Sequence, residues 1–215
     1  MASTIPLGTV PSARAARPAT LSALGLVTLV GLFFVVVAAL PYYAMDAGQI
    51  RSPRRWWLLL HITTGIVALF SGPVQLWLGL TDRRPGLHRR LGMVYLGAIA
   101  TSSVAAYYLA ATNAVGFGFG AGLAGLATAW VITSGLAYLA IRRHLYELHK
   151  EWMIRSYVVT TGFITFRALV VALTAAGIGN GLERVTVAAW FCWSVPLLVT
   201  EAVLQGRKIL RVRTD

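Results

Sequence analysis

The stretch WWLLLHITTGIVALFSGPVQLWLGL (Trp56–Leu80) is 25 residues long and contains no Lys, Arg, Asp or Glu. About 20 apolar residues in a helix cross the hydrocarbon core of a bilayer, so this stretch predicts a transmembrane helix. Together with five similar stretches it predicts six spans, which are Leu21–Ala44, Trp56–Leu80, Leu91–Ala111, Phe119–Ile141, Trp152–Ala176 and Val185–Gln205. We therefore predict an all-α, polytopic integral membrane protein that forms a compact bundle of six transmembrane helices.

The overall composition supports this assignment. Hydrophobic residues make up 57% of the 215 residues and charged residues only 12%, whereas a soluble chain averages about 25% charged residues. The composition therefore excludes a soluble enzyme, a collagen, a disulfide scaffold and a disordered tail. The net charge of +12 lies in loops and tails and is not interleaved with aromatic residues, so we predict membrane lipids, and no nucleic acid, as its partner.

The distribution of Lys and Arg predicts the orientation in the membrane. Fourteen of the nineteen lie on the side of the N-terminus, of the loops after Leu80 and Ile141, and of the C-terminus, and four lie on the other side. Because basic loops stay in the cytoplasm, we predict that both termini are cytoplasmic. The predicted organisation is a flexible basic tail over 1–20, a transmembrane domain over 21–206 and a second basic tail over 207–215.

Two of the spans carry packing patterns. A regularly spaced seam on one face of the second span comprises His61, Gly65, Ala68, Gly72, Gln75 and Gly79. Small residues let a neighbouring helix approach closely. This seam is therefore either a packing surface, whose two polar residues are hydrogen-bonded within the protein, or a face that lines a ligand-binding site. The fourth span begins in a glycine run, Gly116–Gly125, which contains GxGxxG. No strand precedes it, so we predict close helix packing and no dinucleotide site.

Besides Arg155, near the start of the fifth span, two charged residues lie inside predicted spans. Arg167 is twelve residues beyond Arg155, about 18 Å along a helix, and no acidic residue lies at that depth. A guanidinium in hydrocarbon is costly unless it faces a partner. Arg167 is therefore predicted either to be structural, with partial snorkelling, or to face a ligand, and His61, backbone carbonyls, water or an anion would serve it. Glu201 is predicted to pair with Arg155 or Arg207, or to relay protons.

Three of the four histidines lie on the predicted cytoplasmic side. His88 and His149 each open a span that runs outward, 61 residues apart, and a Met and a Tyr follow each of them, which indicates a duplicated two-helix hairpin. Two imidazoles that face each other across a bundle can be the axial ligands of a b-type haem. The alternative is that both are interfacial histidines that contact lipid headgroups.

These patterns predict a cofactor site and a ligand-lining site. His88 and His149 are predicted to bind the iron of one haem b, and the predicted partners of its propionates are Arg89, Arg90 and Arg155. The residues predicted to line a site for a quinone or another small molecule are His61, Gln75, Tyr95, Tyr157, Arg167 and Glu201. No HExxH or CxxC motif is present, so no other metal site is predicted. The single cysteine, Cys192, cannot form an intramolecular disulfide.

Three motifs together resemble one protein family. They are His61-x-x-x-Gly65 with Gly72-Pro73-x-Gln75, then Leu87-His88-Arg89-x-Leu91-Gly92-x-x-Tyr95, then His149-x-x-Trp152-Met153-x-Arg155-x-Tyr157 followed by Arg167. Their combination, over about Leu58–Val170, resembles the bacterial family of predicted membrane proteins called domain of unknown function 2306. The resemblance implies a multi-pass protein of a bacterial inner membrane, and it implies no activity, substrate or cofactor.

The architecture also resembles, more loosely, the four-helix haem core of cytochrome b561-type proteins. Those proteins place two histidines on each side of the membrane. The chain departs from that pattern because His61 has no histidine partner on the outer side, so at most one haem, on the cytoplasmic side, is compatible with it.

Three functions are open at this level. The first is a redox membrane protein with one haem b near the cytoplasmic face and a quinone or other ligand elsewhere in the bundle. The second is a transporter or binding protein for a small anionic or polar solute, with the seam of the second span and Arg167 along its path. The third is an assembly or scaffold subunit, which could also form a homo-oligomer through its small-residue faces.

Overall fold

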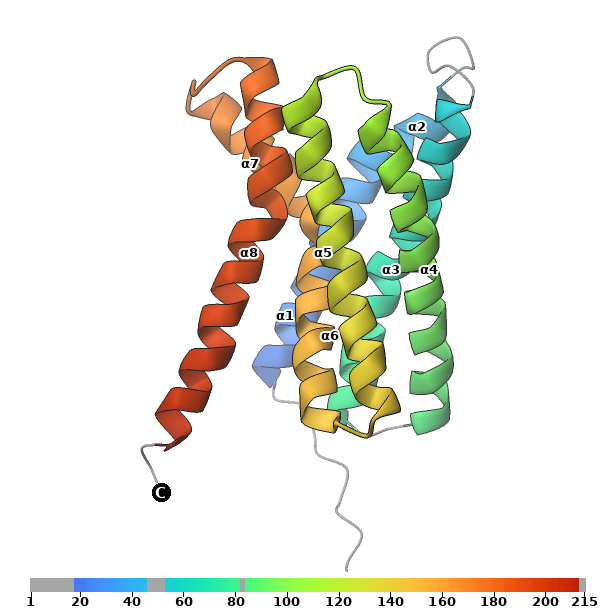
Figure 1. Cartoon of the computed structure of the whole chain (residues 1–215), viewed down its shortest axis with the longest axis vertical. Coiled ribbons are helices and arrows are strands. Elements are labelled where there is room, and N and C mark those ends of the chain that lie inside the picture. The colour runs from blue at the N-terminus through green and yellow to red at the C-terminus, as the bar shows by residue number, and fades with distance from the viewer. Residues whose placement is uncertain (1–17, 46–52, 82–83, 213–215) are drawn as a thin grey trace, which may run out of the picture.

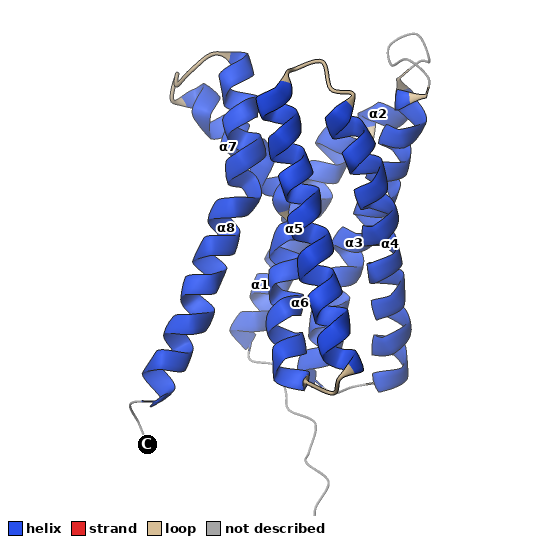
Figure 2. Ribbon diagram, in the orientation of Figure 1, coloured by secondary structure: helices blue, strands red, loops and turns tan. Residues whose placement is uncertain are grey.

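The computed structural model describes residues 18–45, 53–81 and 84–212 (Figure 1). Regular structure in this part of the chain is helical, without a strand (Figure 2), which confirms the all-α class. In chain order the elements are α1 (Pro18–Phe34), a π-helical turn (Val35–Ala39), α2 (Pro41–Ala44), α3 (Arg54–Thr81), α4 (Pro85–Ala111), α5 (Phe117–Arg142), α6 (Tyr146–Thr160), α7 (Gly162–Ala175) and α8 (Gly181–Val212). The predicted tail over 1–20 lies almost entirely outside the described residues.

The chain is a multi-pass membrane protein by the length and apolarity of its helices. Within the part of the chain that the structure describes, five segments are long and apolar enough to cross a bilayer, namely Leu21–Ala44, α3, α4, α5 and most of α8. The pair α6 and α7 meets the same criterion when the two helices form one bent span. Each of the six predicted spans therefore coincides with helix, and the count of exactly six stays a prediction that depends on this pair.

Helices α3, α4, α5 and α6 form an antiparallel four-helix bundle (Figure 1). Consecutive helices are neighbours, and α3 also contacts α6, so the four helices form a closed ring. In this ring α4 lies across from α6, and the two helices run in the same direction (Figure 1). Helices α1, α7 and α8 pack around the outside of the bundle, α1 against α3 and α7, and α8 against α5, α6 and α7.

One end of the bundle, here called the basic end, contains the connections from α3 to α4 and from α5 to α6 and the end of α8 (lower end of Figure 1). The described Lys and Arg residues in or near its connections and the end of α8 are Arg84, Arg89, Arg90, Arg142, Arg143, Lys150, Arg207 and Lys208. At the opposite end the Arg54 guanidinium donates to the Thr112 carbonyl oxygen (2.7 Å), which ties the start of α3 to the end of α4. The orientation of the basic end toward the cytoplasm stays a prediction.

The predicted fifth span is not one straight helix. Helix α6 ends at Thr160, α7 begins at Gly162, and their axes differ by 44°. The Thr161 hydroxyl donates to the Val158 carbonyl oxygen (2.7 Å), and the Thr160 hydroxyl donates to that of Ser156 (2.8 Å). Hydroxyls that bond to their own helix backbone, followed by a glycine, are a common cause of a bend. The sequence Thr160-Thr161-Gly162 therefore sets the position of the break.

Other helix boundaries also differ from the predicted ones, the start of α6 at Tyr146 among them, and α4 and α8 show the reason. Helix α4 begins at Pro85, six residues before the predicted Leu91, because proline is well suited to the first turn of a helix. Helix α8 continues to Val212, into the segment 207–215 that was expected to be a tail. In both cases the polar residues of the basic end form helical turns that extend beyond the apolar stretch.

The glycine run of α5 packs against α8, as the sequence predicts. A methyl group added to Gly122 would lie 3.0 Å from the backbone of Ala189, and one added to Gly125 would lie 2.9 Å from the ring of Trp193. The indole N–H of Trp190 donates to the Gly118 carbonyl oxygen (2.9 Å). The glycines thus allow the two backbones to come close and leave carbonyl groups accessible to indole donors.

Candidate functional site

The two histidines of the predicted haem site lie at equivalent positions at the basic end. His88 is the fourth residue of α4, and His149 is the fourth residue of α6. A residue in the left-handed conformation precedes each helix, Arg84 (φ 54°) before α4 and His144 (φ 58°) before α6. This similarity supports the predicted duplication of a two-helix hairpin, α3–α4 and α5–α6.

Both histidines lie on the faces of their helices that point into the bundle. Residues seven apart share a helix face, so His88 lies below Tyr95 and His149 below Ser156. Tyr95 and Ser156 are fully buried, and the Tyr95 hydroxyl lies 2.8 Å from Ser156 Oγ. Seven residues correspond to about 10 Å along a helix. His88 and His149 are therefore at the same level, about 10 Å below a hydrogen bond that joins α4 to α6.

Each imidazole also contacts the preceding helix of its own hairpin. His149 Nδ1 lies 2.9 Å from the Ala137 carbonyl oxygen. A carbonyl oxygen only accepts a hydrogen bond, so Nδ1 carries the proton and Nε2 has a free lone pair. The ring of His88 packs over Gly79, where an added methyl group would lie 3.2 Å from His88 Cε1.

Gln75 fixes the turn that carries His88. Its side chain is 2% exposed, and Nε2 donates to the His88 carbonyl oxygen (2.7 Å). The amide oxygen Oε1 is buried and accepts no hydrogen bond from a residue in the described part of the chain. A buried acceptor without a donor is costly, so Gln75 Oε1 is a place beside His88 where a water molecule or a ligand would bind favourably.

A buried network of hydroxyl groups lies at the centre of the bundle and joins α4, α5 and α6. The Tyr95 hydroxyl lies 2.8 Å from both Ser156 Oγ and Thr160 Oγ1. The indole N–H of Trp130 donates to Thr160 Oγ1 (2.8 Å), and Ser134 Oγ lies 2.8 Å from Ser156 Oγ. Of these residues only Tyr95 is predicted from the sequence to belong to a site. The signal for the others was the four-residue spacing of Trp130 to Ser134 and of Ser156 to Thr160 in otherwise apolar helices.

Replacing Tyr95 with Phe is expected to lower the free energy of unfolding by about 1–2 kcal/mol, because the buried hydroxyls of Ser156 and Thr160 lose a partner that nothing replaces. Thermal unfolding of the purified protein in detergent measures the change. Tyr107→Phe on the same helix is the matched control, since Tyr107 is 40% exposed and its hydroxyl bonds to Thr128 at the surface (2.9 Å). Equal losses in both variants would contradict the role of the central network.

The seam of α3 is a packing surface toward α4 and α6. His61 Nδ1 lies 2.9 Å from Ser102 Oγ, and the fully buried Ser102 also donates to the His61 carbonyl oxygen (3.2 Å). The ring of Tyr157 lies against Gly72, and its hydroxyl donates to the Leu69 carbonyl oxygen (3.2 Å). These contacts favour the interpretation of the seam as a packing surface. At His61 they do so because its ring Nδ1 is hydrogen-bonded to Ser102 within the bundle.

The buried Arg155 forms an ion pair with the partly exposed Glu201, and this pair joins α6 to α8. Nε and Nη2 of Arg155 lie 2.8 and 2.5 Å from the same oxygen of Glu201. The Arg155 side chain is 7% exposed and that of Glu201 44%. Glu151 lies 3.6 Å from Nη1, and the guanidinium stacks on the ring of Trp152, 4.7 Å from its centroid. The predicted pairing of Glu201 with Arg155 is confirmed, and Arg155 is thus engaged within the protein.

Arg167 lies apart from the other predicted site residues, on α7. Its guanidinium lies 5.8 Å from the ring centroid of Phe163 and 6.0 Å from that of Phe166. Its Nε is buried and has no hydrogen-bond partner among the described residues. His61 is bonded to Ser102 instead and does not serve Arg167. The solute-binding alternative therefore depends on this one side chain.

The structure thus brings the predicted residues into separate groups. His88, Gln75 and His149 lie at the basic end with the exposed Arg89 and Arg90. The core contains Tyr95 and Tyr157, the interface of α6 with α8 contains Glu201, and His61 and Arg167 lie elsewhere. Among residues 18–45, 53–81 and 84–212, no group of three or more His, Cys, Asp or Glu side chains is arranged to hold a metal ion.

A family model described as "Predicted membrane protein (DUF2306)" matches residues 58–204, well over half of the chain. The matched range begins in α3 and ends in α8, so it contains every candidate site residue named above. No curated protein and no solved structure matches the chain.

Proposed function

We propose that the chain, which belongs to the family of predicted membrane proteins described as DUF2306, is a redox membrane protein that binds one b-type haem between His88 and His149. The observation that carries the proposal is the position of these residues. Two imidazoles occupy equivalent turns of parallel helices across a four-helix bundle, on the faces that point inward. From these positions the two imidazoles would hold the iron of a haem within the bundle.

The immediate surroundings of the two imidazoles fit such a group. The Nδ1–H of His149 donates to a backbone carbonyl, as metal-bound histidines usually do, and this bond orients Nε2 as the ligand atom. Gly79 accommodates the ring of His88, and Gly92 accommodates the side-chain amide of Gln75, so both glycines help to position the residues of the proposed site. The group would supply one-electron redox chemistry when bound.

The propionates of the haem would be held by Arg89 and Arg90. Both lie in the turn that follows His88 and are exposed, and guanidinium groups bind carboxylates well. Arg155 belongs to the ion pair with Glu201, so we do not assign it to the haem. We also propose that the basic end faces the cytoplasm of a bacterial inner membrane, which the excess of Lys and Arg at this end supports.

The absorption spectrum of the full chain, purified after expression with a haem precursor, tests the proposal. We expect a Soret band, and we expect His88→Ala and His149→Ala each to abolish it or to reduce it severalfold, because each removes one axial ligand. His144→Ala is the matched control, since His144 is exposed in the adjoining turn and is expected to leave the band unchanged. A wild-type protein without a Soret band would overturn the proposal.

A further inference from the structure

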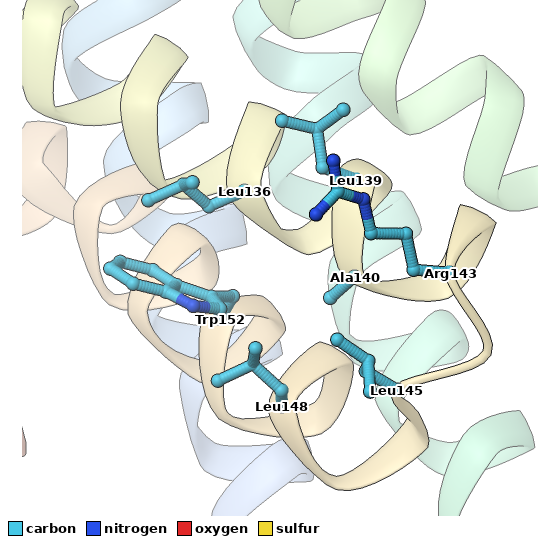
Figure 3. A pocket seen from close by; sticks show the side chains of 7 residues that line it. All are labelled: Leu136, Leu139, Ala140, Arg143, Leu145, Leu148 and Trp152. Carbon is cyan, nitrogen blue, oxygen red and sulfur yellow. The ribbon is translucent and has the colours of Figure 1, made fainter.

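A groove on the surface of the basic end lies between the last turns of α5 and the first turns of α6. Its volume is about 200 Å³, and Figure 3 shows the side chains that line it. They are Leu136, Leu139, Ala140, Arg143, Leu145, Leu148 and Trp152. Ala140 is 3% exposed and forms the floor, where its small side chain leaves space between the larger leucines.

The walls of this α5–α6 groove are held in place. The Leu145 N–H donates to the Ala140 carbonyl oxygen (2.9 Å), and His144 has a left-handed conformation, so the turn between the two helices is tightly closed. The Trp152 ring is fixed from the other side by the guanidinium of Arg155, which is itself bound to Glu201. A ligand would therefore meet a preformed surface and lose little free energy in ordering it.

Arg143 is the charged residue of the lining. Its side chain is exposed, and its guanidinium lies beside Leu139 at the edge of the apolar floor (Figure 3). It forms no ion pair with a carboxylate in the part of the chain that the structure describes. Arg142 adds a second exposed positive charge next to it. The groove thus combines an apolar floor with an unneutralised cation at one rim.

We propose that this groove binds one anionic phospholipid. An acyl chain lies on Leu136, Ala140 and Trp152, and the headgroup phosphate binds the guanidinium of Arg143. A guanidinium matches the geometry of a phosphate, basic pockets between membrane helices bind anionic headgroups, and an indole favours the level of the membrane interface. The proposal uses other residues than the haem site and does not depend on it.

A second groove of similar size provides an internal comparison. It has a volume of about 210 Å³, lies between α1 and α3 and is lined by Leu21, Leu24, Gly25, Thr28, Pro73, Val74 and Trp77. None of these residues is charged. The second groove can accept an acyl chain but has no means to select a headgroup, so selectivity for anionic lipid is expected from the α5–α6 groove alone.

Native mass spectrometry of the full chain in mild detergent, supplied with equal amounts of phosphatidylglycerol and phosphatidylcholine, tests the proposal. We expect the wild type to retain one phosphatidylglycerol in preference to phosphatidylcholine. Arg143→Gln is expected to weaken the retention of phosphatidylglycerol about fivefold, the effect of one basic residue near an anionic lipid. Arg207→Gln removes the same charge at the same end of the molecule but outside the groove, and is expected to change nothing.

A second variant tests the position of the acyl chain. Leu148 is 43% exposed on the rim of the groove, so Leu148→Trp is expected to fold normally, to fill the hollow and to lower the retention of phosphatidylglycerol severalfold. The proposal is overturned by equal losses in Arg143→Gln and Arg207→Gln or by unchanged retention in Leu148→Trp, since either result places the affinity outside the groove. It is also overturned by displacement of the bound lipid with millimolar inorganic phosphate, since that result shows a phosphate site in which the acyl chain contributes nothing.

Discussion

Replacing Gly72 with Ala is expected to lower the free energy of unfolding by about 3 kcal/mol, at the upper end of overpacking effects. The added methyl group would overlap Cε2 and Cδ2 of the Tyr157 ring. Tyr157 is 7% exposed and is held by its hydroxyl at the Leu69 carbonyl oxygen, so the ring cannot move aside without losing that bond. Equilibrium unfolding in mixed micelles measures the change.

Two further variants isolate the steric cause. Gly97→Ala on α4 is the control, because an added methyl group there meets nothing within 4 Å, and alanine is expected to be neutral or slightly stabilising in a helix. In a Tyr157→Leu background, Gly72→Ala is expected to cost less than 1 kcal/mol, since the smaller side chain can give way. Similar losses for Gly72→Ala and Gly97→Ala would show that Tyr157 does not restrict the site.

Replacing Glu201 with Ala is expected to lower the free energy of unfolding by about 2–3 kcal/mol. The change removes the main partner of the Arg155 guanidinium, which is 7% exposed, and a buried charge without its partner is strongly destabilising. The value lies below the usual range for fully buried pairs because Glu201 itself is 44% exposed. Unfolding in mixed micelles again provides the measurement.

The pair Lys150 and Glu147 provides the control for this prediction. Their nitrogen and oxygen lie 2.8 Å apart, but the side chains are 57% and 85% exposed, and exposed pairs contribute about 0–1 kcal/mol. Glu147→Ala is therefore expected to have little effect. The double variant Arg155→Met, Glu201→Met is expected to be more stable than Glu201→Ala, because it leaves no unpaired charge. If Glu147→Ala and Glu201→Ala cost the same, the buried pair is not what joins α6 to α8.

Most of the transmembrane helices could be predicted from the sequence because each contains a long uncharged stretch. The span of α6 and α7 contains Arg155 and Arg167 and is predicted from the apolar residues around these charges. The predicted Leu21–Ala44 and Phe119–Ile141 agree with the helices of the structure to within two residues at each end. The apolar pattern could not predict where the helices end outside the hydrocarbon region or where a span bends. Helix α8 continues into a basic segment, and the break at Thr161 depends on hydroxyl-to-backbone bonds that hydropathy does not register.

The residues of the candidate site could be predicted from the sequence, but the contacts between them could not. The depth and spacing of His88 and His149 indicated equivalent positions, and the structure places them on equivalent turns. The partner of His61 could not be predicted, because Ser102 lies on another helix and the register between the two helices follows from packing. The hydroxyl network was missed for the same reason, since Ser134 and Thr160 look like ordinary small residues of a span until the helices are assembled.

The bond between Arg155 and Glu201 has a consequence for how the chain enters the membrane. During synthesis Arg155 leaves the ribosome 46 residues before Glu201, a delay of about 2–9 s at ordinary elongation rates. For that time the Arg155 guanidinium has Glu151 of its own helix nearby, 3.6 Å from Nη1, but lacks the closer carboxylate of Glu201, and a helix with these charges inserts less readily by itself. We therefore expect α6 to integrate fully only when the last helix supplies Glu201, so a nascent chain stalled before α8 would expose its most polar segment to the quality-control proteases of the membrane.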